Sequence, residues 1–443
     1  MLEKLVFNIK EKELKNLSKV VKAKYTSDAV DGFTPRTAME EAARCLLCID
    51  APCSKGCPAG TDPGKFIRSI RFRNVKGAAE TIRENNVLGG SCARVCPYDR
   101  LCEEACSRCG IDRPIEIGKL QRYAVEQEKA HKMTILKAPA KKKAEKVACV
   151  GSGPASLACA AKLAQEGYQV TIFEAEAKAG GVLTYGITPA RLPQHVVDFD
   201  IKSVKDLGVK FVFDTKVGED ITVEELKKAG YNAIFIGAGL WDAKIPEIPG
   251  KDLVGVTTAV DFLKAARDSK GTFVPGKSVV VIGGGDVAMD CATSAKLLGA
   301  EKVAVYYRRT LEEAPANMTE IQYATSLGIT ISTNFAPAEL IGDKKVQFAV
   351  FNGRDGVSGA KVAADTVVFA IGQAPEDMTK VAPVKLTDKG MISANAKGKT
   401  NVAGIFAAGD IVNGGKTVVE AVAAGKEAAV EIMSYLAKKE GGK

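Results

Sequence analysis

Short apolar runs that end at glycine recur along the last two thirds of the chain and predict buried strands. Residues 146–150 (KVACV) run directly into a Gly-Ser-Gly-Pro turn, which precedes an apolar-faced helix over 155–168 and a second strand over 169–174. The same order of strand, turn, helix and strand returns at 278–307. Because the strands are continuously apolar and alternate with helices, they predict parallel sheets covered on both faces. Three further runs of this kind cover 233–239, 366–372 and 404–410.

The first third of the chain has a different pattern, of short helical stretches without buried strands. Helices are predicted over 63–72 and 75–84, and residues 1–30 are expected to be helical, charged and exposed. A polar stretch at 137–146 (KAPAKKKAEK) has little to bury and is predicted to be a linker. The chain is therefore expected to be an α/β protein with an all-helical domain at its N-terminus.

Composition limits the classes of function open to this chain of 443 residues, whose net charge is +9. No apolar run approaches the roughly 18 residues of a membrane span, and the charged N-terminus lacks a signal-peptide pattern, so the cytoplasm is expected. Aromatic residues are only 6% of the chain and interleave with no basic stripe, which disfavours nucleic-acid binding. His131 and His195 are the only histidines, which disfavours histidine-based zinc sites and histidine acid–base catalysis.

The first glycine turn, Gly151-Ser-Gly153-Pro154, has the spacing of a dinucleotide-binding fingerprint. In such a fingerprint the first glycine makes a tight turn and the second lets the pyrophosphate approach the helix N-terminus. Ser156 replaces the usual third glycine or alanine and is small enough for close helix packing. Glu174 ends the second strand, where a carboxylate accepts a hydrogen bond from a ribose hydroxyl. This context favours nucleotide binding over a turn without a ligand.

A second fingerprint, Gly283-Gly-Gly285-Asp286, lies in an equally good context. Its second strand ends in Tyr-Tyr-Arg308-Arg309, and no acid occupies the position that reads the ribose. Adjacent arginines there suit a 2′-phosphate, which favours NADPH over NADH, unless both arginines are simply solvated surface residues. Two nucleotide sites in one chain, one of them ending in an acid, indicate FAD together with NAD(P)H.

The segment 404–410 (GIFAAGD) resembles the second FAD contact of flavoenzymes that contain two dinucleotide-binding domains. In those enzymes the aspartate, here Asp410 after Gly409, meets the ribityl–pyrophosphate region of the flavin. The helix that follows Lys-Thr417-Val418 then points its N-terminus at the flavin. Taken alone, Asp410 also suits a helix or turn cap.

Nine of the twelve cysteines lie between residues 45 and 109, in two sets. Four thiolates per set is the stoichiometry of a 4Fe–4S cube, and proline after the last cysteine of a run is typical of ferredoxin loops. Structural zinc is the alternative, but zinc prefers paired CxxC knuckles separated by a long gap. The remaining cysteines fall on elements of the nucleotide-binding folds and are expected in the core. The first set is Cys45, Cys48, Cys53 and Cys57; the second is Cys92, Cys96, Cys102, Cys106 and Cys109; the core residues are Cys149, Cys159 and Cys291.

These features together resemble the NAD(P)H-oxidising subunit of bacterial dihydropyrimidine dehydrogenase. The resemblance covers nearly the whole chain, and more distant relatives are the small subunit of glutamate synthase and the large subunit of ferredoxin-dependent NADPH transhydrogenases. All of them share a helical two-cluster domain followed by an adrenodoxin-reductase-like flavin module with two Rossmann-like dinucleotide-binding domains. The segments that carry the resemblance are 51–97, LCEEAC, PIEIGKLQR, GGGDVAMD and AAGDIVNGGKTVVEAV.

The resemblance assigns cluster ligands that spacing alone leaves open. In the second cluster the fourth ligand would be a glutamine, and its amide oxygen removes one negative charge, which should change the cluster potential. Cys92 and Cys109 are then not ligands, although spacing alone would include Cys92 among the ligands. The ligand set implied for the first cluster is Cys45, Cys48, Cys53 and Cys106, and for the second Cys57, Cys96, Cys102 and Gln121.

The same resemblance implies that Gly181, Leu183 and the stretch that includes Arg191 line the flavin. The family's usual Gly-Ile-Pro reads Gly-Ile-Thr-Pro at 186–189, so the proline is displaced by one residue and the local loop shape is expected to differ. His195, just after this loop, is expected to have a structural role rather than to donate a proton.

The expected domains are a helical iron–sulfur domain (1–136), a linker (137–146), an FAD-binding domain in two parts (147–258 and 377–443) and an NAD(P)H-binding domain between them (259–376). Hydride transfer from the nicotinamide to FAD, followed by one-electron steps through two clusters, needs no side-chain base. Only a helical tail follows the flavin module, so the final acceptor is expected on another chain. The resemblance implies a hetero-oligomer with an FMN-containing catalytic subunit that reduces uracil or thymine.

Two alternatives stay open from the sequence. The same relay could serve a glutamate synthase large subunit or a flavin subunit in transhydrogenation. A zinc-stabilised, flavin-free scaffold that only binds nucleotides belongs to a different class, and a colourless protein with stoichiometric zinc would identify it.

Overall fold

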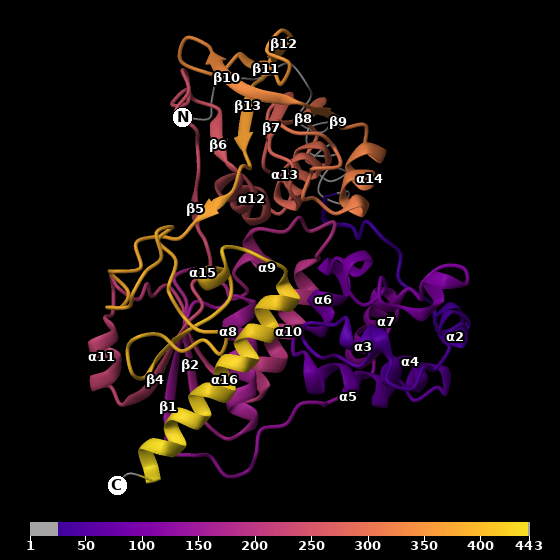
Figure 1. The fold of residues 1–443 in the computed structure, drawn as a ribbon, viewed down its shortest axis with the longest axis vertical. Coiled ribbons are helices and arrows are strands. Elements are labelled where there is room, and N and C mark those ends of the chain that lie inside the picture. The colour runs from indigo at the N-terminus through magenta and orange to yellow at the C-terminus, as the bar shows by residue number, and fades with distance from the viewer. Residues whose placement is uncertain (1–24, 442–443) are drawn as a thin grey trace, which may run out of the picture. The chain divides into compact units, whose positions relative to one another are not determined.

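The structure, a computed structural model, describes residues 25–441 (Figure 1). The described residues form two compact units, and each unit contains several segments of the chain. The first unit holds 25–29, Tyr185–Pro193 and Asp242–Gln373, and the second holds Val30–Thr184, Gln194–Trp241 and the chain from Ala374 onward. Most of the helical segment expected over 1–30 therefore lies outside the described residues.

The N-terminal part of the second unit is helical, and local capping signals define where its helices begin. Thr34 and Thr37 form a capping box around Pro35, and the Asp62 carboxylate accepts a hydrogen bond from the Lys65 backbone N–H. The helices expected over 63–72 and 75–84 are confirmed. The elements are α2 (Pro35–Ala43), α3 (Pro52–Lys55), α4 (Pro63–Arg71), α5 (Val75–Asn85), α6 (Gly89–Val95) and α7 (Ile117–Ala130), with 3-10 turns at Tyr98–Arg100 and Ser107–Gly110.

The rest of the second unit is built on a parallel sheet of five strands in the order β15-β4-β1-β2-β3. Val147 of the central strand pairs with Val170 on one side and Ala233 on the other, so apolar runs lie against one another. Burial of these strands explains why each reads as continuously apolar. The strands are β1 (Lys146–Val150), β2 (Gln169–Phe173), β3 (Lys210–Val212), β4 (Tyr231–Ile236) and β15 (Ile405–Ala407). The helices along this part are α8 (Pro154–Gln165), α9 (Val182–Tyr185), α10 (Gln194–Asp206), α11 (Val223–Lys228), α15 (Asp410–Asn413) and α16 (Val418–Gly441).

Helix α16 crosses helix α8 at very short range (Figure 1). A side chain at Gly425 of α16 would overlap the backbone carbonyl of Ala155 in α8, so the crossing requires glycine. Ala155 is the second residue of α8, directly after the first glycine turn. The crossing therefore fixes the C-terminal helix against the start of the nucleotide-binding helix.

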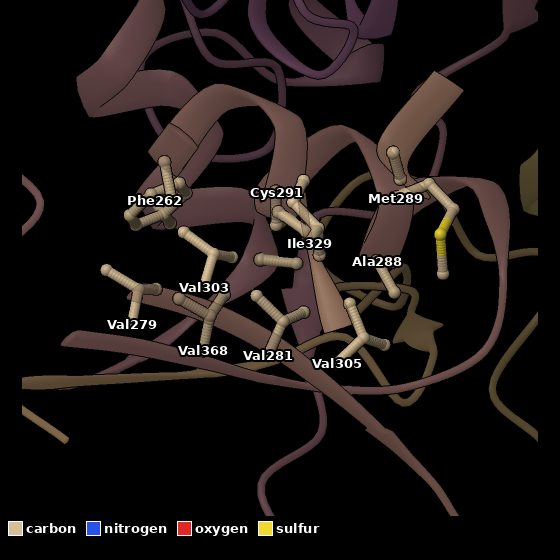
Figure 2. Packing of buried hydrophobic residues seen from close by; sticks show 14 of the residues in the cluster. Phe262, Val279, Val281, Ala288, Met289, Cys291, Val303, Val305, Ile329 and Val368 are labelled. Carbon is tan, nitrogen blue, oxygen red and sulfur yellow. The ribbon is translucent and has the colours of Figure 1, made fainter. Parts of the chain in front are cut away.

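The first unit contains a second parallel sheet, in the order β6-β13-β7-β8-β9. Figure 2 shows valines of β7, β8 and β13 packed against Ala288 and Cys291 of α13. Cys291 is fully buried, as are Cys149 and Cys159 in the second unit, which confirms that these three cysteines are core residues. The elements are β6 (Val256–Thr258), α12 (Ala259–Asp268), β7 (Ser278–Ile282), α13 (Asp286–Leu297), β8 (Lys302–Tyr307), α14 (Met318–Ser326), β9 (Thr330–Thr333) and β13 (Thr366–Phe369).

The sequence pattern does not predict two features of the first unit. An antiparallel sheet of three strands, β10 (Phe335–Ile341), β11 (Phe348–Gly353) and β12 (Gly359–Ala363), adjoins the parallel one in sequence, and β5 (Asp242–Ala243) forms a two-stranded ribbon with β14 (Gln373–Ala374). Tyr25 belongs to the segment expected to be exposed, yet it is fully buried in a cluster with Ala190 and Ala266. That expectation is wrong for Tyr25, because its ring supplies apolar surface to a core formed by distant segments.

Candidate functional site

The first glycine turn joins β1 to α8, and its two glycines serve different purposes. Gly151 has a φ of 81°, and a side chain there would lie 2.9 Å from the Gly237 carbonyl oxygen, so the fold itself requires glycine. Gly153 caps α8 with an ordinary φ of −69°, and the nearest atom to a side chain there would be 3.9 Å away. No described atom close to Gly153 requires glycine there, and the open space leaves room for a ligand to approach the backbone.

A second glycine pair lies directly on this turn. Gly181 has a φ of 54°, and a side chain there would come within 2.9 Å of the Gly153 Cα. The Gly180 N–H donates a hydrogen bond of 3.0 Å to the Ser152 hydroxyl. Leu183, two residues further on, is fully buried. The stretch that the family resemblance associates with the flavin is thus in contact with the first fingerprint.

The Glu174 carboxylate lies beside the same turn, after the end of β2. Its Oε2 accepts hydrogen bonds from the Ser152 N–H (2.9 Å) and hydroxyl (2.5 Å), and its Oε1 accepts one from the Glu176 N–H (2.8 Å). Burial raises the pKa of Glu174, and the Ser152 hydroxyl opposes that shift. Each carboxylate oxygen has two lone pairs, so acceptor capacity remains on Oε1 for a ribose hydroxyl.

One of the C-terminal candidates, Gly409, lies against the start of α8. A side chain at Gly409, whose φ is 80°, would lie 2.9 Å from the Ala155 Cβ. Asp410 begins α15, its Oδ1 accepts a hydrogen bond from the Lys416 N–H (3.2 Å), and burial raises its pKa. The Thr417 hydroxyl accepts from the Glu420 N–H (3.3 Å) ahead of Val418, the first residue of α16.

Three separate segments of the second unit therefore converge on the N-terminus of α8. They are the first glycine turn, the Gly180–Gly181 stretch and the segment around Gly409. Backbone N–H groups at a helix N-terminus, an unhindered glycine and buried carboxylates are the groups that a dinucleotide requires. These residues are compatible with FAD.

The second glycine turn, in the first unit, repeats this division of roles. A side chain at Gly283 would overlap the Ala370 carbonyl, so that position is set by the fold. Gly285 caps α13 with a φ of −101°, and the nearest atom to a side chain there would be 3.8 Å away. Asp286 accepts hydrogen bonds from the Asn317 N–H (2.7 Å) and side-chain amide (2.8 Å), which tie the turn to the start of α14.

Arg308 and Arg309 follow β8 directly, and both are exposed. The Arg309 carbonyl accepts a hydrogen bond from the Asn334 N–H (2.9 Å), which fixes the backbone at this point. The end of the second strand of such a unit is where a dinucleotide's adenosine ribose is recognised. The structure thus places two solvent-accessible guanidinium groups at that edge of the sheet.

Arg191 lies in the first unit, eight residues after Leu183 in the sequence. Its guanidinium pairs with Asp290 of α13 (3.0 Å) and Glu320 of α14 (2.8 Å). Burial raises the pKa of Asp290 to about 7, and Arg191 opposes that shift. Arg267 of α12 donates to the carbonyls of Ile187 and Leu192, which fixes the rest of this loop. The geometry therefore gives Arg191 the contacts of a loop anchor.

Four cysteines line one cavity of the helical part. Cys45, Cys48, Cys53 and Cys106 share this cavity with apolar residues such as Ile67 and Ile115. Burial raises the pKa of Cys53 to about 11, with the neighbouring thiols of Cys106, Cys45 and Cys48 adding to the shift. Clustered thiolates of this kind are costly without a cationic metal centre, so the donor set suits iron–sulfur binding.

Three further cysteines form a second group. The pKa of Cys96 is raised by a hydrogen bond to Cys92, by burial, and by the nearby thiols of Cys102 and Cys57. Burial also raises the pKa of Cys102, and Glu103 and Cys57 add to that shift. Cys57, Cys96 and Cys102 are therefore neighbours in space, although 45 positions separate Cys57 from Cys102 in the sequence.

The two remaining cysteines and Gln121 lie on three different elements. Cys92 is buried in α6, next to Cys96. Cys109 is exposed, and its thiol donates to the Glu103 carbonyl (3.3 Å). The Gln121 amide of α7 donates from Nε2 to the Gly89 carbonyl (2.8 Å), which leaves its Oε1 available as an acceptor or ligand. Among the described residues, no three His, Cys, Asp or Glu side chains are gathered as for a single metal ion.

Comparison with known families agrees with this geometry. A family model described as pyridine nucleotide-disulphide oxidoreductase matches residues 145–425, and one described as dihydropyrimidine dehydrogenase domain II, 4Fe–4S cluster, matches residues 22–133. With the two nucleotide turns and the cysteine groups, they define an NAD(P)H-dependent oxidoreductase with FAD and 4Fe–4S cofactors. The chain belongs to the pyridine nucleotide-disulphide oxidoreductase family.

Individual relatives narrow the comparison. The NAD-dependent dihydropyrimidine dehydrogenase subunit PreT of Escherichia coli O157:H7 is 45% identical over 416 residues, which cover 93% of this chain and 97% of that protein. The NADP(+)-dependent formate dehydrogenase subunit beta of Moorella thermoacetica is 36% identical and covers 88% of this chain and 60% of its own length. The NADPH-Fe(3+) oxidoreductase subunit beta of Geobacter sulfurreducens is 34% identical, and the match covers 87% of this chain and 64% of that protein. The resemblance to dihydropyrimidine dehydrogenase subunits is confirmed, and all three relatives are named as subunits.

Solved structures agree on the fold. FprA from Mycobacterium tuberculosis in complex with NADPH superimposes with a TM-score of 0.58 at 19% identity, covering 68% of this chain and 86% of that one. Thioredoxin reductase of Lactococcus lactis gives 0.56 at 23% identity, covering 66% and 99%. Together with the family matches, these likenesses confirm the α/β fold class with Rossmann-like domains. Among the described residues, every helix is too short or too polar to span a bilayer.

Sequence reasoning missed Ser152 and Gly237 as parts of the first nucleotide site. Ser152 connects the fingerprint to Glu174 and to Gly180, and Gly237 provides the carbonyl that faces Gly151. The signals available in the sequence are the hydroxyl inside the Gly-x-Gly turn and the glycine that ends the strand at 233–239. Neither signal is specific without the spatial partner.

Proposed function

We propose that the chain is the electron-input subunit of a dihydropyrimidine dehydrogenase. In this proposal it takes electrons from NAD(P)H and passes them through FAD and two 4Fe–4S clusters to a partner subunit. The observation that carries the proposal is the 45% identity, over 93% of the chain, to a protein named as that subunit. Two nucleotide turns on parallel sheets and nine clustered cysteines in one chain support it.

Bound FAD would supply the conversion of one hydride's electron pair into two single electrons. The role of the protein is to bind and orient, and no side-chain base is required. We assign the pyrophosphate to the turn at Gly151, Gly153 and Pro154, and a ribose hydroxyl to Glu174. The ribityl and flavin region is assigned to Gly181, Leu183, Gly409, Asp410, Thr417 and Val418. Of these, Gly181 and Gly409 lie directly against the start of α8. Arg191 enters this proposal as the anchor of its loop.

The two cysteine groups support the ligand sets implied by the family. We define the first ligand set as Cys45, Cys48, Cys53 and Cys106, which line one cavity. The second ligand set is Cys57, Cys96, Cys102 and Gln121, and the thiols of its three cysteines are mutual neighbours. The hydrogen bond from Gln121 Nε2 to Gly89 favours the amide oxygen as the fourth ligand.

The domain boundaries and the location belong to the same proposal. The iron–sulfur domain is assigned to 1–136, the linker to 137–146, the FAD-binding domain to 147–258 and 377–443, and the NAD(P)H-binding domain to 259–376. A cytoplasmic location is proposed because cluster ligands must remain reduced thiols before assembly.

The arginine pair predicts the preferred nicotinamide cofactor. Charge-assisted hydrogen bonds to a phosphate contribute about 1.5–3 kcal/mol, so changing both Arg308 and Arg309 to glutamine should raise the KM for NADPH by about 10- to 100-fold. The KM for NADH should stay within about twofold. Steady-state dye reduction with each cofactor measures this. The 45% identical relative is named NAD-dependent. An equal rise in the KM for both cofactors would reject a 2′-phosphate contact.

The partner is proposed to be an FMN-containing, iron–sulfur catalytic subunit in a hetero-oligomer that reduces uracil or thymine. The subunit names of the relatives support a partner. The name of the 45% identical relative points to the pyrimidine ring as acceptor. The purified chain should oxidise NAD(P)H with artificial dyes and leave uracil unchanged. Uracil reduction should begin only when the catalytic subunit is added. Uracil reduction by the chain alone would refute this division of labour.

A second candidate keeps the relay and changes its acceptor. The formate dehydrogenase and Fe(3+) oxidoreductase beta subunits, at 36% and 34% identity, favour it. An anaerobic pull-down with this chain distinguishes the two candidates. If the chain belongs to a dihydropyrimidine dehydrogenase, a pyrimidine-reducing partner is recovered with it. Recovery of a glutamate synthase large subunit, or of a transhydrogenase flavin subunit, would support the other candidate.

A further inference from the structure

A buried carboxylate of the flavin-binding part is bonded to the iron–sulfur part. Asp200 lies on α10 and is only 1% exposed. Its Oδ2 accepts hydrogen bonds from the Ser91 N–H (2.7 Å) and the Ser91 hydroxyl (2.8 Å), and its Oδ1 accepts one from the Gly90 N–H (3.3 Å). These donors belong to the first turn of α6, so Asp200 fixes where that helix begins.

The charge of Asp200 is compensated in the interior. Arg83 of α5 donates from Nη1 to Asp200 Oδ1 (2.7 Å) and from Nε to Glu128 Oε2 of α7 (2.8 Å). The Arg83 guanidinium also faces the ring of Phe199 on α10, 5.3 Å from its centroid. Burial raises the pKa of Glu128, and Arg83 opposes that shift. A network this buried is costly to break on one side only, because it leaves an unpaired charge.

Both ends of α6 lead to the second ligand set. At its start, the Gly89 carbonyl accepts the hydrogen bond that orients the Gln121 amide. At its end, Cys96 is the residue that caps the helix. A shift of α6 therefore changes the direction of the Gln121 oxygen and the position of the Cys96 sulfur together.

A second charged side chain of the flavin-binding part reaches the segment that follows Cys57. Lys426 of α16 donates from Nζ to the Ala59 carbonyl (2.7 Å) and to the Asn85 carbonyl (2.6 Å). Ala59 is two residues after Cys57, and the Cys57 thiol lies close enough to interact electrostatically with the Lys426 ammonium. The cavity of the first ligand set, in contrast, is lined only by residues from 45 to 117.

We propose that Asp200 and Lys426 are positioning residues for the second cluster, so that the flavin-binding part of the chain holds that cluster's ligands while the first cluster depends on the helical part alone. The inference rests on the proposed function, since it assumes two clusters. It explains why a carboxylate and an ammonium on two flavin-side helices both point at segments that carry second-set ligands.

The test compares Asp200→Asn and Lys426→Met in the full chain, prepared anaerobically. Asp200→Asn should lower iron from about eight to about four atoms per chain, with FAD retained, because α6 loses its anchor. Lys426→Met should keep both clusters and lower the reduction potential of the second one by about 59 mV. For one electron, that shift is about a tenfold change in the ratio of reduced to oxidised cluster at a fixed potential. EPR-monitored redox titration measures this shift. Lys426→Arg, which keeps the charge, should restore the potential.

Matched controls lie on α10. Asp198→Asn and Lys202→Met remove the same charges from exposed positions and should leave iron content and both potentials unchanged. If wild type holds fewer than two clusters, the proposed function itself fails. If wild type holds both, the inference is overturned when both variants keep both clusters at wild-type potentials, or when the two clusters shift together. Should Asp200→Asn also lose FAD, the comparison of Lys426→Met with Lys426→Arg decides.

Discussion

A Gly153→Ala chain is expected to fold and to lose most of its FAD. The nearest atom to the new methyl would be 3.9 Å away, and the φ of −69° suits alanine, so the apo-protein should unfold within about 2 °C of wild type. The methyl instead occupies the space through which a pyrophosphate approaches the N-terminus of α8. Overpacking a close contact costs about 1–3 kcal/mol, which corresponds to about 10- to 100-fold weaker FAD binding.

Flavin fluorescence titration of the apo-protein measures this loss. Gly151→Ala is the matched comparison, because its φ of 81° and its contact with the Gly237 carbonyl make glycine a requirement of the fold. Gly151→Ala should therefore lower the stability of the apo-protein itself. Wild-type FAD affinity in Gly153→Ala would show that this turn does not receive the pyrophosphate.

Replacing Cys106 by alanine is expected to separate dye reduction from electron delivery. Cys106 lines the cavity with the other three members of the first ligand set, and a cube that lacks one thiolate is expected to be lost. Iron should fall by about half, and electron delivery to the partner should drop by at least about 100-fold. NAD(P)H-dependent dye reduction should continue, since the nucleotide sites contain no residue of this cavity.

The control for this substitution is Cys109→Ala, three residues further along. Cys109 is exposed and donates to the Glu103 carbonyl, so its loss should leave iron content and electron delivery unchanged. Iron analysis and assays with the reconstituted partner measure both variants. If Cys106→Ala keeps all its iron while Cys109→Ala loses half, the assignment of ligands between these two cysteines is reversed.

The nucleotide-binding elements could be predicted from the sequence because their signals are local. The strand expected at 146–150 matches β1 residue for residue, and the repeat expected from residue 278 begins with β7, since a buried parallel strand is apolar throughout and its glycine turn follows at once. The helices after the two turns were predictable for the same reason. Each signal lies within about 30 residues of chain.

Features that depend on distant partners could not be predicted in the same way. The antiparallel strands β10 to β12 are partly exposed, so their sequence lacks the continuous apolar runs of the parallel sheets. Burial of Tyr25 depends on Ala190 and Ala266, which lie more than a hundred positions away. The pairing of Arg191 with Asp290 and Glu320 likewise needs three segments to meet.

The division of the cysteines shows the same limit. Spacing predicts two groups of thiols, but it places Cys106 in the second group and counts Cys92 as a ligand. In the structure Cys106 lines a cavity with Cys45, Cys48 and Cys53, because the segment around Cys106 folds back against the segment 45–53. The ligand sets stay a prediction, and the cavity supports the first of them.

Iron and acid-labile sulfide, counted per chain in an oxygen-free preparation, test the central claim most directly. A chain that relays electrons from a nicotinamide to another subunit should contain about eight of each, together with one FAD. Finding zinc, or flavin without iron and sulfide, would contradict the account.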